Sequence, residues 1–86
     1  MAHVIVYTKS YCPFSKECKT FLEEKKVEFD EKIVDQDPAL EQEMERKTNR
    51  RTDTPHVFIN GHHMGTFDDL KALDASGKLD EMLDIK

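Results

Sequence analysis

Residues 4–15 read VIVYTKSYCPFS, and the pattern changes near the middle of this stretch. Its first four residues form an apolar run of the kind found in strands. After Pro13, the pair Phe21-Leu22 stands among lysines and glutamates, as on a half-buried helix. The pattern predicts a strand over residues 3–8 and a helix over residues 13–26, joined by a short turn that carries a cysteine.

Cys12 is the main candidate for chemistry because it directly precedes Pro13, and proline is favoured at the first position of a helix. Free amide groups and the positive end of the helix dipole would point at its sulfur, which lowers the pKa of a thiol. Lys9 adds a nearby positive charge. A lone cysteine is more commonly a small buried hydrophobic residue. Here the strand end, the proline and the lysine together favour an exposed, nucleophilic thiolate.

Ser15 and Cys18 are the other residues with a possible role at this thiol. Ser15 occupies the position where a dithiol oxidoreductase has its second cysteine, and its hydroxyl can bond a thiolate but cannot form a disulfide. Cys18 lies six residues after Cys12, about 9 Å along a helix, whereas a disulfide tolerates a Cα separation of about 7 Å. We expect Cys18 to be a partly buried helix residue. Only melting of the first helical turn would make it a resolving thiol.

The central part of the chain predicts one more strand and one more helix. Residues 27–34 alternate apolar and charged side chains, which indicates a half-buried strand. Asp35-Gln36-Asp37-Pro38 then predicts a helix start, because proline commonly follows an acidic cap. That helix is expected to run to about Thr48-Asn49, where asparagine suits a left-handed cap.

The last third of the chain predicts a hairpin and a final helical region. Residues 57–59 form a short apolar strand, and Asn60-Gly61 is a strong signal for a two-residue hairpin turn. Residues 62–64 are the return strand. Gly65-Thr66 leads into a leucine-rich helical region that Gly77 is expected to divide in two.

The element order is β-α-β-α-β-β-α, which indicates an α/β fold. Two strands joined through a helix are parallel, with a right-handed crossover, and the last two strands form a hairpin. We therefore expect a single domain over residues 1–86, with a four-stranded mixed sheet and helices on both faces. Cys12 then lies at the carboxyl end of the first strand, where open α/β sheets place their ligands.

Charge and composition argue against several classes of partner. The net charge of −5 disfavours nucleic acid, and no apolar stretch approaches the roughly 20 residues that span a membrane. Two cysteines and no visible signal peptide lead us to expect a reduced, cytoplasmic protein. One basic cluster, Arg46, Lys47, Arg50 and Arg51, is either a solvated helix end or a site for an anionic ligand.

Several motifs are spread along the chain, namely residues 4–15, Asp53-Thr54-Pro55, Phe58-Ile59-Asn60-Gly61, Met64-Gly65 and Phe67-Asp68-Asp69-Leu70. Together they resemble the glutaredoxin family over essentially the whole chain. The resemblance implies the thioredoxin fold and glutathione-dependent thiol–disulfide exchange, chiefly the reduction of glutathione mixed disulfides. Glutathione would be the co-substrate, and glutathionylated or disulfide-containing proteins would be the partners of a monomeric enzyme.

The resemblance also assigns roles to individual residues. Cys12 resembles the nucleophile, and Lys9 resembles the lysine that stabilises the thiolate or binds the glycine carboxylate of glutathione. Pro55 resembles the family's cis-proline, which would leave the backbone of Thr54 free to pair with glutathione like an added strand. The implied catalytic set is Cys12, Lys9 and Ser15. The implied glutathione set is Lys9, Tyr11, Cys12, Phe14, Thr54, Pro55, Thr66, Phe67, Asp68 and Asp69.

Within that set, the start of the last helix would hold the γ-glutamyl end of glutathione. Asp68 resembles the residue that receives the ammonium group, and the backbone amides near Phe67 and Asp68 would take the carboxylate. On its residues alone, the pair Asp68-Asp69 is equally explained as two acidic residues that the helix dipole favours.

The chain departs from the family pattern at four positions. Ser10 replaces a proline, Asp53 brings a negative charge close to the site, Thr66 replaces a glycine, and Ser15 removes the dithiol route. None of these changes removes the nucleophile. We expect them to alter substrate preference and rate while the class of chemistry stays the same.

The histidines do not predict a metal site. His62-His63 lies beside the hairpin turn and His56 follows Pro55, with no cysteine at ligand spacing. We interpret them as solvated turn and strand residues and predict no metal ligands.

The preferred hypothesis is a monothiol mechanism, which needs only Cys12. A second is a homodimer that holds a [2Fe–2S] cluster through Cys12 of each chain and two glutathiones, although Pro13 stiffens the loop and the chain has no tryptophan. A third is a glutathione-independent electron donor to ribonucleotide reductase, which would need a second active-site cysteine that Ser15 replaces.

Overall fold

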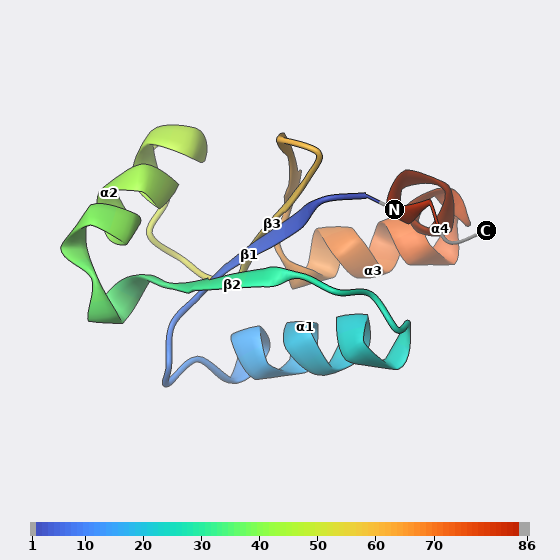
Figure 1. Cartoon of the computed structure of the whole chain (residues 1–86), viewed down its shortest axis with the longest axis horizontal. Coiled ribbons are helices and arrows are strands. Elements are labelled where there is room, and N and C mark those ends of the chain that lie inside the picture. Colours follow the sequence, from blue (N-terminus) through green and yellow to red (C-terminus); the bar gives the residue numbers. More distant parts are fainter. Residues whose placement is uncertain (1, 85–86) are drawn as a thin grey trace.

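The computed structural model describes residues 2–84 as a four-stranded sheet with helices on both faces (Figure 1). The strands lie in the order β2-β1-β3-β4. The elements are β1 (Val4–Thr8), α1 (Pro13–Glu24), β2 (Asp30–Ile33), the 3₁₀ turn η1 (Val34–Gln36), α2 (Pro38–Lys47), β3 (His56–Ile59), β4 (His62–Gly65), α3 (Phe67–Ala75) and α4 (Lys78–Leu83).

The sheet has the predicted mixed topology. β1 pairs in parallel with β2, to which α1 connects it, and antiparallel with β3. β3 and β4 form the hairpin, and Asn60 and Gly61 both have positive φ values, +52° and +83°. Two positive φ values in succession give the turn whose twist matches that of the flanking strands. The hairpin signal in the sequence is therefore confirmed.

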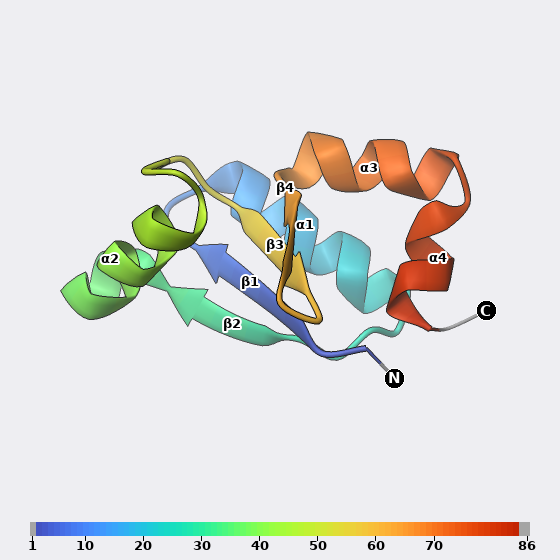
Figure 2. The same ribbon diagram turned by 90° about the horizontal axis from the view of Figure 1, so that it is seen from above.

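Each face of the sheet has its own apolar core. Alternate residues of β1 point to opposite faces, and Val4 and Val6 pack with α1, α3 and α4. On the other face, Tyr7 packs with Phe58, Val34 and Met44 beneath α2. Figure 2 shows α2 on its own, apart from the other helices. The two central strands are thus covered on both sides, as expected for strands inside an α/β sheet.

The second strand is shorter than predicted at both ends. The sequence pattern indicated residues 27–34, but β2 covers only Asp30–Ile33. Val27 instead donates its amide to the carbonyl of Leu22 and packs in the core, so it closes the turn that follows α1. Val34 is buried at the start of η1. The apolar alternation correctly indicated that Val27 and Val34 are buried. The strand is shorter because its backbone pairing with β1 covers only residues 30–33.

The helix ends mostly follow their capping signals. The side chain of Asp37 accepts a hydrogen bond from the amide of Ala39 at 3.0 Å, with Pro38 as the first residue of α2. Asn49 has the expected left-handed φ of +60°, and Gly77, at +80°, separates α3 from α4. α1 ends at Glu24, two residues before the predicted end. None of the helices described over residues 2–84 is long and apolar enough to cross a membrane.

Candidate functional site

Cys12 lies at the start of α1, just beyond the carboxyl end of β1. Its backbone is extended (φ −89°, ψ 116°), and Pro13 is the first helical residue. The amide of Cys12 donates to the carbonyl of Lys9 at 3.1 Å, which closes a tight turn between strand and helix. The sulfur is partly exposed. These features are those predicted for a reactive thiol at a helix start.

The surroundings of Cys12 favour its thiolate. Partial burial raises the pKa of the thiol, but hydrogen bonds from the side chains of Thr54 and Ser15 and from the amides of Ser15 and Phe14 outweigh this effect, so the pKa is lowered. Each of these bonds stabilises the negatively charged sulfur. Ser15 itself is buried. It therefore contributes to the site through its hydroxyl group, in the position where a second cysteine would stand.

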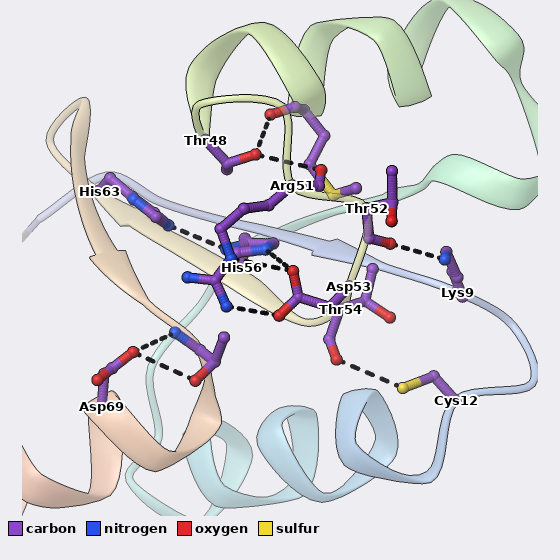
Figure 3. Close-up of polar contacts among 12 residues, drawn as sticks. Lys9, Cys12, Thr48, Arg51, Thr52, Asp53, Thr54, His56, His63 and Asp69 are labelled. Atoms are coloured by element: carbon purple, nitrogen blue, oxygen red, sulfur yellow. Dashed lines mark hydrogen bonds and ion pairs between the residues drawn. The ribbon is translucent and has the colours of Figure 1, made fainter.

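The segment opposite Cys12 contains the expected cis peptide bond between Thr54 and Pro55. The carbonyl of Thr54 accepts a hydrogen bond from the Cys12 thiol at 3.6 Å, as Figure 3 shows. β1 and β3 are adjacent antiparallel strands, so the turn after β1 and the segment before β3 meet at the same end of the sheet. The sheet topology thus places the sulfur beside backbone groups that are 42 residues away in the sequence.

Lys9 and Ser10 hold the turn before Cys12 in place. The ammonium of Lys9 donates to the carbonyl of Thr52 at 2.7 Å, next to the cis-proline segment. The amide and hydroxyl of Ser10 both donate to the carboxylate of Asp35, at 3.0 and 2.5 Å. Ser10, which replaces the family's proline, therefore fixes the loop by hydrogen bonds instead of by a ring.

A groove of about 360 Å³ lies next to Thr54. It includes six residues of the predicted glutathione set together with two others, and its lining consists of Phe14, Arg51, Asp53, Thr54, Pro55, Thr66, Phe67 and Asp68. Lys9, Tyr11, Cys12 and Asp69 do not line it. The sulfur of Cys12 reaches it through its contact with Thr54. Tyr11 and Phe14 project into solvent beside the sulfur, 72% and 60% exposed.

Arg51 and Asp53 are the two lining residues outside the predicted set. The sequence left the basic cluster open between a helix end and an anion site, and the structure separates its members. Arg51 lines the groove, whereas Arg46 and Arg50 line a different hollow at the end of α2. The negative charge of Asp53 is paired with Arg51 at 2.6 Å.

The two acidic residues at the start of α3 have different roles. The carboxylate of Asp69 accepts hydrogen bonds from the amide and the hydroxyl of Thr66, at 2.9 and 3.2 Å, and so caps the helix. Asp68 is 89% exposed, and its carboxylate lies 3.4 Å from the ammonium of Lys71. Asp68 is therefore available to a ligand in the groove, while Asp69 shapes the helix end that presents it.

A larger hollow of about 690 Å³ lies elsewhere on the molecule. It is formed around the beginning of β1 and the end of α1, and His3, Val27 and Phe29 are among its lining residues. Cys12 follows the opposite end of β1, and neither cysteine lines this hollow. Size alone does not identify the site, and the smaller groove beside the thiol is the better candidate.

The interpretation of the histidines was wrong for His56, which is fully buried and not solvated. Its ring bonds to Asp53 at 3.2 Å and to His63 at 2.9 Å. A polar ring is tolerated in the core when both nitrogens have partners. His62 and His63 are exposed, as predicted. Over residues 2–84 there is no group of three side chains arranged to hold a metal ion.

Cys18 is more deeply buried than predicted. Its side chain is fully enclosed in the core between α1 and the sheet, and burial raises the pKa of its thiol to about 12. Such a thiol is neither accessible nor ionised near neutral pH. The intact helix start gives Cys18 no route to Cys12.

Comparisons with known proteins agree with this geometry. A model of the glutaredoxin family matches residues 4–64. Glutaredoxin 3 of Escherichia coli (strain K12) is 43% identical over 83 residues, which cover 96% of this chain and 99% of that protein. The glutaredoxin of Pseudomonas aeruginosa is 40% identical over 83 residues, covering 96% of this chain and 98% of that protein.

Solved structures give the same answer. The solution structure of glutaredoxin from Brucella melitensis has a TM-score of 0.83 and 41% identity, covering 96% of this chain and 89% of that one. The crystal structure of a buckwheat glutaredoxin–glutathione complex has a TM-score of 0.86 and 26% identity, covering 96% of this chain and 77% of that one. Sequence and structure thus agree over nearly all of the described residues, and the chain belongs to the glutaredoxin family of glutathione-dependent thiol oxidoreductases, with a thioredoxin fold.

Proposed function

We propose that this protein reduces glutathione mixed disulfides by a monothiol mechanism. The thiolate of Cys12 attacks the glutathione sulfur of a mixed disulfide, and the substrate protein leaves as a thiolate that takes up a proton. The thiolate of a second glutathione then attacks the Cys12–glutathione disulfide, releasing oxidised glutathione and the Cys12 thiolate. One disulfide is reduced and one is formed, so no other electron donor is needed.

The accessibility of the sulfur atoms carries this proposal. Cys12 is partly exposed with a lowered pKa, whereas Cys18 is fully buried with a raised pKa. Ser15 supplies a hydroxyl where a dithiol enzyme would have its second sulfur. A single reactive thiol supports the route that needs one cysteine.

The groove offers a complementary group to each part of glutathione. The backbone of Thr54 suits the extended cysteinyl part. The amides at the start of α3 suit the γ-glutamyl carboxylate, and the exposed carboxylate of Asp68 suits the ammonium group. Arg51 is the cation that lines the groove, and it suits the glycine carboxylate. Lys9 is held by Thr52 close by and adds positive charge.

The surface around the thiol also suits a protein substrate. Tyr11 and Phe14 are exposed on either side of Cys12, and aromatic residues are enriched at binding surfaces. We infer that they contact the protein part of a glutathionylated substrate. We expect the protein to act as a monomer in the reducing cytoplasm, because this surface is then free to bind a substrate and glutathione is available as the co-substrate.

Mass spectrometry after treatment with oxidised glutathione tests the proposal. We expect one glutathione adduct, on Cys12, and no Cys12–Cys18 disulfide. Cys18→Ala should give the same adduct and a rate of deglutathionylation within about twofold of the parent, because the buried thiol takes no part. An adduct on Cys18, or a large loss of rate in Cys18→Ala, would show that α1 opens at its start.

Asp68→Ala tests the γ-glutamyl end of the groove. Losing a charge-assisted contact costs about 1–3 kcal/mol, so we expect KM for glutathione to rise roughly 5- to 150-fold. The pKa of the Cys12 thiol should stay nearly the same. Steady-state kinetics with varied glutathione measures the effect, and replacement of the exposed Glu81 of α4 (Glu81→Ala) is a control with the same change of charge. A parental KM in Asp68→Ala would mean that the ammonium group binds elsewhere.

A further inference from the structure

Four side chains form a continuous hydrogen-bonded chain beside the groove (Figure 3). Arg51 donates through Nε and Nη2 to the two carboxylate oxygens of Asp53, at 3.0 and 2.6 Å. Nε2 of His56 lies 3.2 Å from Oδ1 of Asp53, and Nδ1 of His56 lies 2.9 Å from Nε2 of His63. The chain therefore runs from the exposed His63 on β4, through the buried His56 on β3, to a cation at the groove.

The partners assign the protons along this chain. The carboxylate of Asp53 can only accept, so Nε2 of His56 carries the hydrogen that it donates. Nδ1 of neutral His56 then accepts from Nε2–H of His63. Burial lowers the pKa of His56, which agrees with the neutral form. Over residues 2–84 no buried side-chain nitrogen or oxygen lacks a partner, so the assembly is fully satisfied.

Arg51 is fixed at both its backbone and its side chain. Its carbonyl accepts a hydrogen bond from the buried Thr48 at 3.3 Å, which ties it to the end of α2. Its guanidinium uses two of five N–H donors on Asp53. The remaining donors are left for a ligand in the groove that Arg51 lines. A guanidinium held in this way loses less freedom when a carboxylate binds to it.

The negative charge of Asp53 in this groove is explained by its ion pair with Arg51. Glutathione carries two carboxylates, and an acidic residue in its groove would repel them. The Arg51 and His56 contacts hold the pKa of Asp53 down to about 2, so it is ionised at neutral pH. An ionised aspartate in this groove strengthens the binding of an anion only if it orients the cation that binds the anion.

We propose that Asp53 and His56 are positioning residues that hold the guanidinium of Arg51 in place to receive a carboxylate of glutathione. His56 acts one step behind, by orienting the carboxylate of Asp53 from within the core. This inference rests on the proposed use of glutathione. It assigns a function to the Asp53 departure from the family motif and to the buried histidine that follows Pro55.

The direction in which Asp53→Asn changes KM for glutathione distinguishes a positioning role of Asp53 from a direct electrostatic effect. If Asp53 only contributes a negative charge, its removal lowers KM for glutathione. If it positions Arg51, its removal raises KM by about three- to tenfold while kcat stays within about twofold of the parent. Steady-state kinetics with varied glutathione measures both constants. An unchanged or lowered KM overturns the inference.

A double-mutant cycle tests whether Asp53 acts through Arg51. Arg51→Gln should raise KM for glutathione about tenfold, as expected for losing a charge-assisted contact. In that background, adding Asp53→Asn should raise KM no further, because no guanidinium remains to be oriented. Additive effects overturn the inference. Arg50→Gln is the matched control, since it removes the same charge from the neighbouring residue, which faces a different hollow, and should leave KM near the parental value.

Two replacements of His56 test its role behind Asp53. His56→Gln keeps a donor near the position of Nε2 and should keep KM within about twofold of the parent. His56→Leu removes the donor but keeps the site apolar and filled, and should raise KM about threefold with kcat little changed. Equal KM values for both variants, at similar thermal stability, overturn the role of His56.

The Cys12 adduct distinguishes failure of this inference from failure of the proposed function. If the proposed function is wrong, the parent forms no glutathione adduct on Cys12 and shows no saturable dependence on glutathione. If only the positioning role is wrong, the parent forms the adduct and saturates with glutathione, and Asp53→Asn does not raise KM.

Discussion

Cys12→Ser is expected to lower the turnover of a glutathione mixed disulfide by at least about 10³-fold, because a serine hydroxyl is not ionised at neutral pH and is a poor nucleophile. The fold should be retained, since serine is a favoured residue at the start of a helix. A coupled assay of deglutathionylation measures the rate. Ultraviolet titration of the thiolate in the parent should give a midpoint below the ordinary value of about 8.5, and this signal should vanish in the variant.

Ser15→Ala provides the matched control for this experiment. It removes a hydroxyl that stabilises the thiolate but leaves the nucleophile in place. We expect the thiol pKa to rise toward its ordinary value and the rate at neutral pH to fall by less than about tenfold. If Cys12→Ser kept more activity than Ser15→Ala, the nucleophile would have to be another residue.

Gly65→Ala is expected to destabilise the protein by about 2–4 kcal/mol, which corresponds to a fall in Tm of roughly 10–25 °C. Gly65 has a φ of +103°, which side chains rarely adopt, and a Cβ there would overlap the carboxylate of Asp69. The carboxylate would have to move, and the cap on Thr66 would be lost. Because this helix end borders the groove, KM for glutathione should rise as well. Thermal unfolding and steady-state kinetics measure the two effects.

Gly61→Ala separates the two causes of this loss. Gly61 also has a positive φ, +83°, but a Cβ there would meet nothing within 4 Å. We expect it to cost only about 1–2 kcal/mol, the price of the backbone conformation, with no change in KM for glutathione. Equal losses in the two variants would mean that the Asp69 cap contributes nothing to stability or to the groove.

Local sequence determined the elements and the nucleophile, because each depends on neighbouring residues. Pro13 starts α1 directly after Cys12, and this arrangement brings the amides of Phe14 and Ser15, which help to lower the pKa of the thiol, to the partly exposed sulfur. Asn60-Gly61 gave the hairpin through two positive φ values, and Gly77 divided the last helical region. The element order in turn implied a mixed sheet, since a helical crossover makes strands parallel. These features need no knowledge of distant contacts.

Tertiary structure alone decided which side chains meet at the groove. Arg50 and Arg51 are adjacent in the sequence, but the positive φ values of Asn49 and Arg50 turn the chain so that Arg51 reaches Asp53 and Arg50 does not. His56 was predicted to be a surface residue because its side chain is polar. It is buried on a central strand, where Asp53 and His63 are hydrogen-bond partners of its two ring nitrogens. The hydrophobic periodicity of a sequence indicates which side chains are buried, but not which partners they contact. That choice depends on strand pairing and loop geometry between segments far apart in the chain, and so it arises only when the whole sheet is assembled.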